Sequence, residues 1–244
     1  MTPVRLLSLL LLPLAAACAT TGGGTSPQDP LESFNRSVYR FNDTVDRYAL
    51  KPVAQTYKKI VPQPVQLIVT SFFANLDDLY TGANNLLQAK PQDALVDVTR
   101  FVVNSTLGFV GFADVASEIG LQKHHEDFGQ TLGRWGVPSG PYLVIPLLGP
   151  STFRDAPARA ADIFAHPLLL YDASSRERNI LWGLILVNER AGLLDAEKVI
   201  EGAALDRYSL IRDGWLQRRR NAVYDGEPPE EPEMEDDSGY SDGK

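Results

Sequence analysis

The segment His124-His125-Glu126-Asp127 holds the densest group of side chains that could bind a metal ion or transfer a proton. Neighbouring residues point about 100° apart on a helix and to opposite faces of a strand, so the two histidines are poorly placed to share one ion. The spacing is not that of the HExxH zinc motif, and only His166 remains as a third histidine. The sequence therefore favours a solvated polar turn here, with no metal and no cofactor.

Hydroxyl and thiol groups show no catalytic pattern either. Ser105, Ser139 and Ser151 lack the GxSxG surroundings of a hydrolase nucleophile, and neither a P-loop nor a GxGxxG run occurs. We therefore expect a protein that is not an enzyme. The alternative is a lipid-directed hydrolase that uses His124 or His125.

A basic cluster lies at the end of the last predicted helix, near Trp215. It consists of Arg212 and the run Arg218-Arg219-Arg220. Cations at a helix C-terminus complement the helix dipole, which explains the cluster without a ligand. The functional interpretation is that Arg218, Arg219 and Arg220 contact anionic lipid headgroups or an acidic partner.

The charge of the chain is unevenly distributed. Residues 225–244 carry nine acidic side chains and one lysine, which accounts for the whole net charge of −8 of the 244 residues. The rest of the chain is electroneutral, which argues against a nucleic-acid partner. Because residues 225–244 hold almost nothing apolar, they are predicted to be a disordered acidic tail.

The N-terminus has the pattern of an export signal. Residues 1–17 combine a short basic start with an apolar stretch that ends in three alanines, and the only cysteine, Cys18, follows directly. Leu14-Ala15-Ala16-Ala17-Cys18 resembles a bacterial lipobox, in which the thiol is acylated; Ala15 departs from the usual large residue. The alternative is ordinary cleavage that leaves a free thiol. Ala19, in place of aspartate, favours the outer membrane, and residues 18–28 form a flexible tether.

Amphipathic helices are predicted through most of residues 29–224. The first begins at Asp29-Pro30, with Asp29 as cap, carries an apolar stripe to Tyr48 and ends at Lys51-Pro52. That stripe suits either a packed core or a membrane interface. No apolar run reaches the length of a membrane span. The other predicted helices are Val53–Ile60, one or two within Val65–Leu87, Asp93–Ser105, Phe153–Phe164, Ser175–Leu194, Asp195–Gly202 and Asp206–Val223.

Glycine and proline interrupt the helical pattern between Asp127 and Asp155. Glycines allow left-handed backbone or close approach, and prolines fix the conformations between them. The stretch is predicted to be irregular, with a short strand in Tyr142–Leu148. It is either a gate that moves against rigid helices or a static packed connection. The candidate hinge residues are Gly129, Gly133, Gly136, Gly140 and Pro141.

Several strings in order along the chain resemble the MlaA/VacJ lipoproteins. The most specific is EDFGQTLGRWG at Glu126–Gly136. The resemblance runs from Asp29 to Ala161 and is weaker beyond that residue. The other matching runs are Asp29–Asn42, Lys51–Val61, Phe72–Leu76, Asn84–Gln88, Arg100–Val115 and Gly140–Asp155.

The resemblance implies a mainly α fold: a ring of amphipathic helices embedded in the inner leaflet of the outer membrane, with at most a short β hairpin. It implies removal of phospholipids that have strayed into the outer leaflet, through an amphipathic channel, to a periplasmic lipid carrier. It also implies association with a trimeric porin. The alternative is a porin-associated lipoprotein that holds lipid or scaffolds the porin without moving lipid.

Overall fold

The structure is a computed structural model that describes residues 27–170, 174–203 and 206–230. The predicted signal peptide, Cys18 and most of the predicted tether lie outside these residues. The helical elements are α2 (Glu32–Val45), the π-helical segment η2 (Asp46–Leu50), α3 (Lys51–Ile60), α4 (Gln63–Leu87), α5 (Pro91–Thr106), α6 (Val115–Glu118), α7 (Phe128–Arg134), α8 (Asp155–Ala165), α9 (Pro167–Leu170), α10 (Ser175–Ala203) and α11 (Arg207–Val223).

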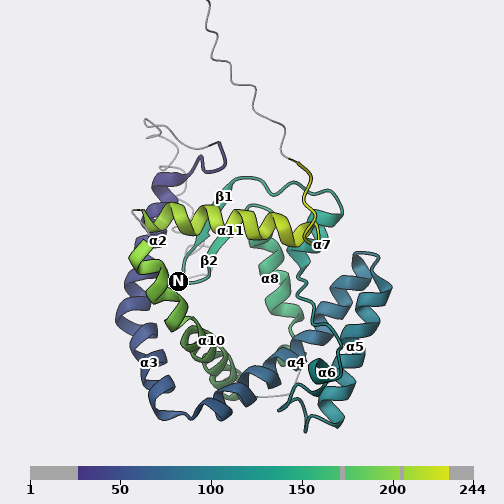
Figure 1. The fold of residues 1–244 in the computed structure, drawn as a ribbon. Coiled ribbons are helices and arrows are strands. Elements are labelled where there is room, and N and C mark those ends of the chain that lie inside the picture. The colour runs from purple at the N-terminus through teal and green to yellow at the C-terminus, as the bar shows by residue number, and fades with distance from the viewer. Residues whose placement is uncertain (1–26, 171–173, 204–205, 231–244) are drawn as a thin grey trace, which may run out of the picture.

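These helices are arranged around a ring (Figure 1). In that view α2 and α3 form one side, α4 crosses the bottom, α5 and α6 lie on the opposite side, and α11 crosses the top towards α7. Contacts between the elements follow the same circuit, because α10 packs on α3 and α4, α4 packs on α5, and α11 packs on α7. The mainly α, ring-like architecture predicted from the resemblance is confirmed. No helix in the described ranges is both long and apolar enough to cross a bilayer.

The first helical run continues past the point where the sequence predicts its end. Pro52 lies in the first turn of α3, and η2 connects α2 to α3 without a break. A proline cannot donate a backbone hydrogen bond, and the wider π turn before it changes the bonding register, so the chain stays helical. The predicted stop at Lys51-Pro52 is therefore wrong.

Asp29 does not cap the first helix, because its side chain is directed into the protein. The N-cap position of α2 is Leu31, which makes no side-chain capping bond. The Asp29 carboxylate is fully buried and accepts hydrogen bonds from Asn35 Nδ2 (2.8 Å) and Tyr208 Oη (2.5 Å). Asp29 therefore joins the start of α2 to α11, two segments far apart in the sequence.

The short hairpin is confirmed. Strand β1 (Tyr142–Ile145) pairs antiparallel with β2 (Gly149–Thr152), with Tyr142 opposite Thr152 and Ile145 opposite Gly149. The side chain of Asn35 binds both Tyr142 O (3.0 Å) and Val144 N (2.8 Å), so an amide on α2 extends the hydrogen bonding of β1. The hairpin is thereby attached to α2.

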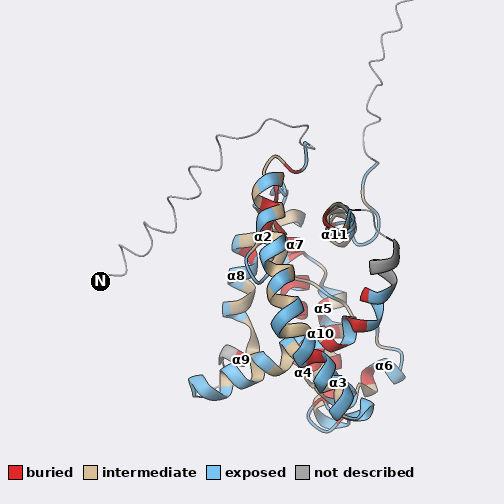
Figure 2. Ribbon diagram, turned by 90° about the vertical axis from the view of Figure 1, so that its left-hand side faces the viewer, coloured by how far each residue is buried: buried red, intermediate tan, exposed pale blue. Residues whose placement is uncertain are grey.

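Helices α4 and α5 bury polar side chains and expose apolar ones. Buried positions on α4 include Asn75, Asp78, Asn84 and Asn85, and on α5 they include Asp97, Arg100 and Asn104. Figure 2 shows that buried residues form only short patches along the helices, while the rest of the ribbon is exposed or intermediate. The exposed large side chains on the two helices are Val65, Leu67, Ile68, Leu79, Leu86, Leu87, Leu95, Val98 and Val102.

Candidate functional site

A pocket of about 1020 Å³ lies between the end of α11 and the irregular loop that follows α7. From the loop it is lined by Gly136, Ser139 and Gly140, and from α11 by the run Arg218–Arg220. The structure therefore brings the predicted hinge stretch and the predicted headgroup contacts, which are some eighty residues apart in the sequence, to one place. We define this as the basic pocket.

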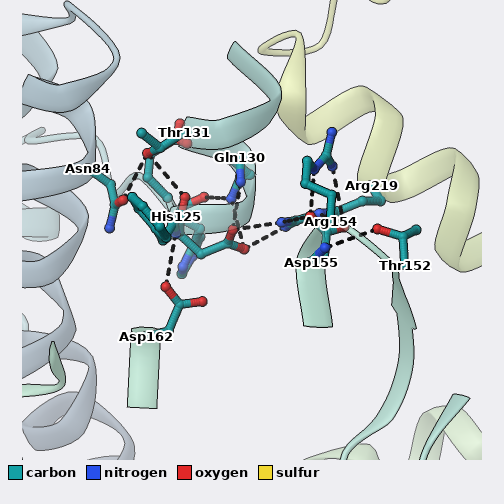
Figure 3. A network of polar contacts seen from close by, with 12 residues as sticks. Asn84, His125, Gln130, Thr131, Thr152, Arg154, Asp155, Asp162 and Arg219 are labelled. Carbon is teal, nitrogen blue, oxygen red and sulfur yellow. Dashed lines mark hydrogen bonds and ion pairs between the residues drawn. The ribbon is translucent and has the colours of Figure 1, made fainter. Parts of the chain in front are cut away.

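Arg219 lines the basic pocket, and its guanidinium lies between two carboxylates (Figure 3). Its Nη1 and Nη2 bind Asp127 Oδ2 and Oδ1 at 2.5 and 2.7 Å, and its Nε and Nη2 bind Asp155 Oδ2 and Oδ1 at 2.8 and 3.0 Å. Paired contacts of this kind are among the strongest that arginine makes. Arg219 therefore fastens α11 to the starts of α7 and α8.

The same contacts keep both carboxylates ionised. Burial opposes ionisation of Asp127, but the hydrogen bonds from Arg219 outweigh it and hold the pKa of Asp127 below its ordinary value. Burial is likewise outweighed at Asp155, where Arg219 and Arg154 together lower the pKa. Arg154 donates from Nε to Asp155 Oδ1 at 2.8 Å and is itself buried. Two arginines that line the basic pocket, Arg154 and Arg219, are thus neutralised by Asp127 and Asp155.

The other two arginines of the run, Arg218 and Arg220, differ from Arg219. Arg218 is exposed, and Arg220, which is half-buried, donates to the carbonyl of Pro229. Adjacent helical residues point in different directions, so a run of three arginines cannot present all its guanidinium groups to one ligand. Of the three predicted headgroup contacts, Arg219 is instead committed to two carboxylates, and Arg218 is the arginine that faces solvent.

The predicted hinge residues fall into two groups. Gly129 and Gly133 lie inside α7, where a Cβ atom would come within 2.2 Å of Arg219 Nη2 and 2.8 Å of Val223 Cγ1, respectively. Those two glycines allow close packing against α11. Gly136 and Gly140 lie in the loop and have left-handed backbone, with φ of 89° and 66°, and Gly140 directly precedes Pro141. Only the stretch Gly136–Pro141 has the irregular backbone that the hinge prediction needs.

The residues of the segment 124–127 bind three different parts of the protein. His124 Nδ1 is 2.8 Å from Asp97 Oδ1, Glu126 accepts hydrogen bonds from Gln88 (2.8 Å) and Lys90 (3.2 Å), and Asp127 caps α7 through Gln130 N (2.8 Å). The predicted solvated turn is therefore wrong for His124, which is half-buried, and describes only the exposed His125. Within the described residues no three metal-ligating side chains lie close enough to hold an ion.

A second, smaller pocket of about 450 Å³ touches the start of α7 at Phe128. Its walls come from α4 and from α8 to α9 and include Leu79, Leu87, Ala161 and Pro167. Tyr80 also lines it and donates a hydrogen bond to Asp162, which accepts a second one from Phe128 N at 3.0 Å. We call it the apolar pocket. The basic pocket, lined by arginines, and the apolar pocket thus contact the two ends of one short helix.

Sequence reasoning missed Arg154 and Asp155 as members of the site. The signal for Asp127 is visible in hindsight, because Asp127-Phe128-Gly129-Gln130 is a capping sequence at the start of a helix. Arg154 and Asp155 give no comparable signal, since two adjacent charges at a helix start are common on protein surfaces. Their burial follows from the packing of α8 beside α7 and β2.

Comparison with known proteins reveals relatives over most of the chain. The family described as MlaA lipoprotein matches residues 27–222. The intermembrane phospholipid transport system lipoprotein MlaA of Escherichia coli (strain K12) is 35% identical over 226 residues, covering 90% of this chain and 89% of that protein. The protein of the same name from Haemophilus influenzae is 30% identical and covers 92% of this chain and 94% of that protein.

A solved structure is similar as well. It is described as the structural basis for maintenance of bacterial outer membrane lipid asymmetry, and it superposes with a TM-score of 0.67 at 32% sequence identity. The match covers 80% of this chain and 98% of that one.

Proposed function

The chain belongs to the MlaA lipoprotein family, and from that premise we propose that it removes mislocalised phospholipids from the outer leaflet of an outer membrane. In this proposal the lipids pass through an amphipathic channel within the helical ring to a periplasmic lipid carrier, and a trimeric porin holds the protein in place. No covalent bond changes during such transport. Family membership supports the lipid substrate, and the polarity of the helices supports the membrane location.

One observation carries the proposal: the inverted burial of α4 and α5. A helix of a water-soluble protein buries its apolar face, because burial of apolar area stabilises the fold. On α5 the opposite holds, since Leu95, Val98 and Val102 are 67%, 41% and 51% exposed, while Asp97 and Arg100 are buried. Side chains arranged in this way are stable where lipid tails surround the helices and water lies within the ring.

The two pockets supply surfaces for the two parts of a phospholipid. Moving a charged headgroup through hydrocarbon without polar partners is costly, and a polar wall lowers that cost. In our proposal the exposed Arg218, with Arg220, contacts the phosphate at the basic pocket, and acyl chains remain against apolar surface such as Leu79 and Leu87. Arg219 positions the wall and does not itself bind lipid.

We further propose that the loop Gly136–Pro141 gates the basic pocket, since it forms one of its walls. Lid loops commonly hinge at a few residues whose backbone absorbs the change. A disulfide between a cysteine at Ser139 and one at the facing end of α11 would test this. We expect oxidation to block lipid clearance and reduction to restore it. Clearance at an unchanged rate in the oxidised protein would exclude the gate.

Cys18 is proposed to anchor the protein after acylation. Several acyl chains on one cysteine suffice for stable attachment to a bilayer, whereas a single chain gives only reversible binding. Replacement Cys18→Ser should leave an uncleaved or soluble periplasmic form that does not clear lipid. Normal outer-membrane fractionation of this variant would contradict the anchor.

The decisive measurement is the amount of phospholipid in the outer leaflet of cells with and without this protein. Loss of the protein should raise it, and a plasmid copy should restore it. An unchanged outer leaflet in the deletion strain would overturn the proposal and favour a porin scaffold. Alanine substitutions at His124 and His125 serve as a further control, because a hydrolase that uses either histidine would lose activity whereas a transporter would not.

A further inference from the structure

The loop between α5 and α6 presents a compact group of apolar side chains. No charged residue occurs between Thr106 and Ala113. We define Leu107–Ala113 as the apolar loop. Its large side chains, with their exposed fractions, are Leu107 (65%), Phe109 (78%), Val110 (64%) and Phe112 (49%).

The apolar loop is held in a backbone conformation that its residues do not prefer. Phe109 and Val110 have φ of 52° and 61°, and a left-handed backbone is unusual for a bulky residue and rarer still for a β-branched one. Such strain persists only where the surroundings fix it, and it concentrates at functional positions. Gly108 is one such fixed point, because a Cβ there would come within 2.2 Å of Ala113 O.

Buried polar groups fix the base of the loop. Asp114, which follows the loop, accepts hydrogen bonds from Arg100 Nη2 (2.9 and 3.0 Å) and Asn104 Nδ2 (2.9 Å). On the other flank Asn75 Nδ2 donates to Ser105 Oγ at 3.0 Å. The loop is therefore preformed, and its exposed side chains are displayed on a rigid base.

Six of the seven backbone amides of the loop are hydrogen-bonded, within the loop or to the last turn of α5, as a hydrocarbon environment favours. In lipid every unbonded N–H group is costly, because no water is present to accept from it. Here the amides of Leu107 and Gly108 donate to Val103 O, and that of Ala113 donates to Gly108 O at 2.9 Å. The amides of Val110, Gly111 and Phe112 donate to Ser105 O, Asn104 O and Phe109 O, at 3.1, 2.8 and 3.3 Å.

We propose that the apolar loop is a rigid wedge that inserts among the lipid acyl chains of the membrane and fixes how deeply the ring sits. The occupant is lipid because six of the seven loop amides are already hydrogen-bonded, charge is absent, and the loop continues the exposed apolar face of α5 at Val102. A protein partner would instead favour free polar groups at the rim of the patch. The inference rests on the proposed membrane location of the ring.

The first test places a photo-activated crosslinking amino acid at Phe109 in living cells. Tyr48 is the matched control, because it is equally exposed at 78% but lies beside the charged residues Arg47 and Asp46. We expect the probe at position 109 to form phospholipid adducts and the probe at position 48 to form several-fold fewer. A protein adduct at position 109, or equal lipid labelling at both positions, would overturn the wedge.

The second test measures binding of the full-length Cys18→Ser protein to vesicles of phosphatidylethanolamine and phosphatidylglycerol. Phe109→Asp should weaken binding about ten-fold or more, since an aspartate at membrane depth is strongly disfavoured. Aspartate tolerates a left-handed backbone, so the loop should keep its shape. Tyr48→Asp should change binding less than three-fold. Equal loss in both variants, or none at Phe109→Asp, contradicts the wedge.

These outcomes separate the wedge from the proposed function. If position 109 labels protein while the wild type still clears outer-leaflet phospholipid, the wedge fails and the transport proposal stands. If position 109 labels lipid while deletion of the protein leaves the outer leaflet unchanged, the transport proposal fails and the wedge stands.

Discussion

The pair α4–α5 and the corner formed by α2, the hairpin and α11 are stabilised in opposite ways. In the corner Tyr142, Val144 and Tyr208 form a buried aromatic and aliphatic cluster of the kind found in water-soluble proteins. Between α4 and α5 the most deeply buried large side chain is Arg100, which pairs with Asp78 and Asp114. One chain thus combines a conventional apolar core with a polar core. In our proposal the region with the polar core, α4 and α5, is the one that faces lipid.

The largest expected effect comes from breaking the polar core. Arg100→Ala removes a buried guanidinium that lies 3.4 Å from Asp78 and donates to Asp114. Breaking a buried ion pair typically costs about 3–5 kcal/mol of unfolding free energy, and because Asp78 keeps its ion pair with Lys123, we expect a loss near the lower end, about 3 kcal/mol. The measurement is chemical unfolding followed by circular dichroism in mild detergent. Arg134→Ala is the control, because Arg134 is exposed and its nearest carboxylate, Asp225, is 3.8 Å away. A loss under about 1 kcal/mol for Arg100→Ala would show that the polar core contributes little.

In the corner formed by α2, the hairpin and α11, loss of one hydrogen bond should lower the unfolding free energy less than Arg100→Ala does. Tyr208→Phe removes the 2.5 Å hydrogen bond to Asp29 but keeps the ring that packs against Tyr142. A hydrogen bond to a charged group contributes about 1.5–3 kcal/mol, so the unfolding free energy should fall by that amount. Tyr48→Phe, at an exposed position, should change it by less than about 0.5 kcal/mol. A drop in the Tyr208→Phe variant as large as that of Arg100→Ala would remove the contrast between the two regions.

Acid should weaken the polar core at Asp114 and the contacts of Arg219 with Asp127 and Asp155. Burial is outweighed by hydrogen bonds from Ser117, Asn104 and Arg100, which bring the pKa of Asp114 to about 2, and the pKa values of Asp127 and Asp155 are also lowered. A carboxyl with a lowered native pKa stabilises the fold above its unfolded pKa of about 4, and that stability is lost as the pH falls through the native pKa. The contribution of these three carboxylates to the unfolding free energy should decline between about pH 4 and 2.

A double variant checks the cause of that decline. Asp127→Asn with Asp155→Asn should be less stable at pH 7, because Arg219 loses both ionic partners. Its stability should then depend less on pH in the acid range than that of the wild type. An unchanged pH slope would assign acid sensitivity to other carboxylates.

The smallest effect is expected at the start of the predicted acidic tail. The sequence predicts a disordered tail from Asp225 onward, but residues 225–230 contact the ring. Asp225 pairs with Lys90 and lies 3.8 Å from Arg134. Because Asp225 is exposed, Asp225→Ala should cost less than about 1 kcal/mol. Truncation after Glu230 keeps these contacts and should not change the melting temperature. A fall of several degrees would show that residues 231–244, which lie outside the described residues, pack on the ring.

Helix positions were predictable because prolines and apolar periodicity are local signals. The boundary between α4 and α5 falls between the predicted helices in Val65–Leu87 and Asp93–Ser105, and the hairpin occupies the predicted glycine- and proline-rich stretch. The sequence could not reveal which side of an amphipathic helix faces inward, since the spacing of Leu95, Val98 and Val102 is the same for a water-facing and a lipid-facing protein. Predicting two helices in place of α10 was wrong, because Asp195 is charged and exposed without ending the helix.

Only the residue types of the candidate site could be recognised from the sequence, because they are local signals. Arginines at the end of α11 and glycines after α7 were identifiable by type, and the structure brings both groups to the basic pocket. Which arginine turns inward depends on the rotation of α11 against α7 and α8, and that rotation is set by long-range contacts to Asp127 and Asp155. A local pattern carries no information about such contacts.

The π-helical segment Asp46–Leu50 determines how α3 is rotated relative to α2 within one continuous helical run. Upstream of it α2 presents Asn35 to the hairpin, and downstream α3 presents Ala54 to Ala191 and Leu194 of α10. Because each residue of a helix turns it by about 100°, the extra residue of a π turn acts as an angular offset between those two docking faces. Removing one residue from this segment would leave α2 and α3 helical but would rotate one of them away from the hairpin or from α10. Closure of the ring therefore depends on the number of residues in the π-helical segment as well as on their identity.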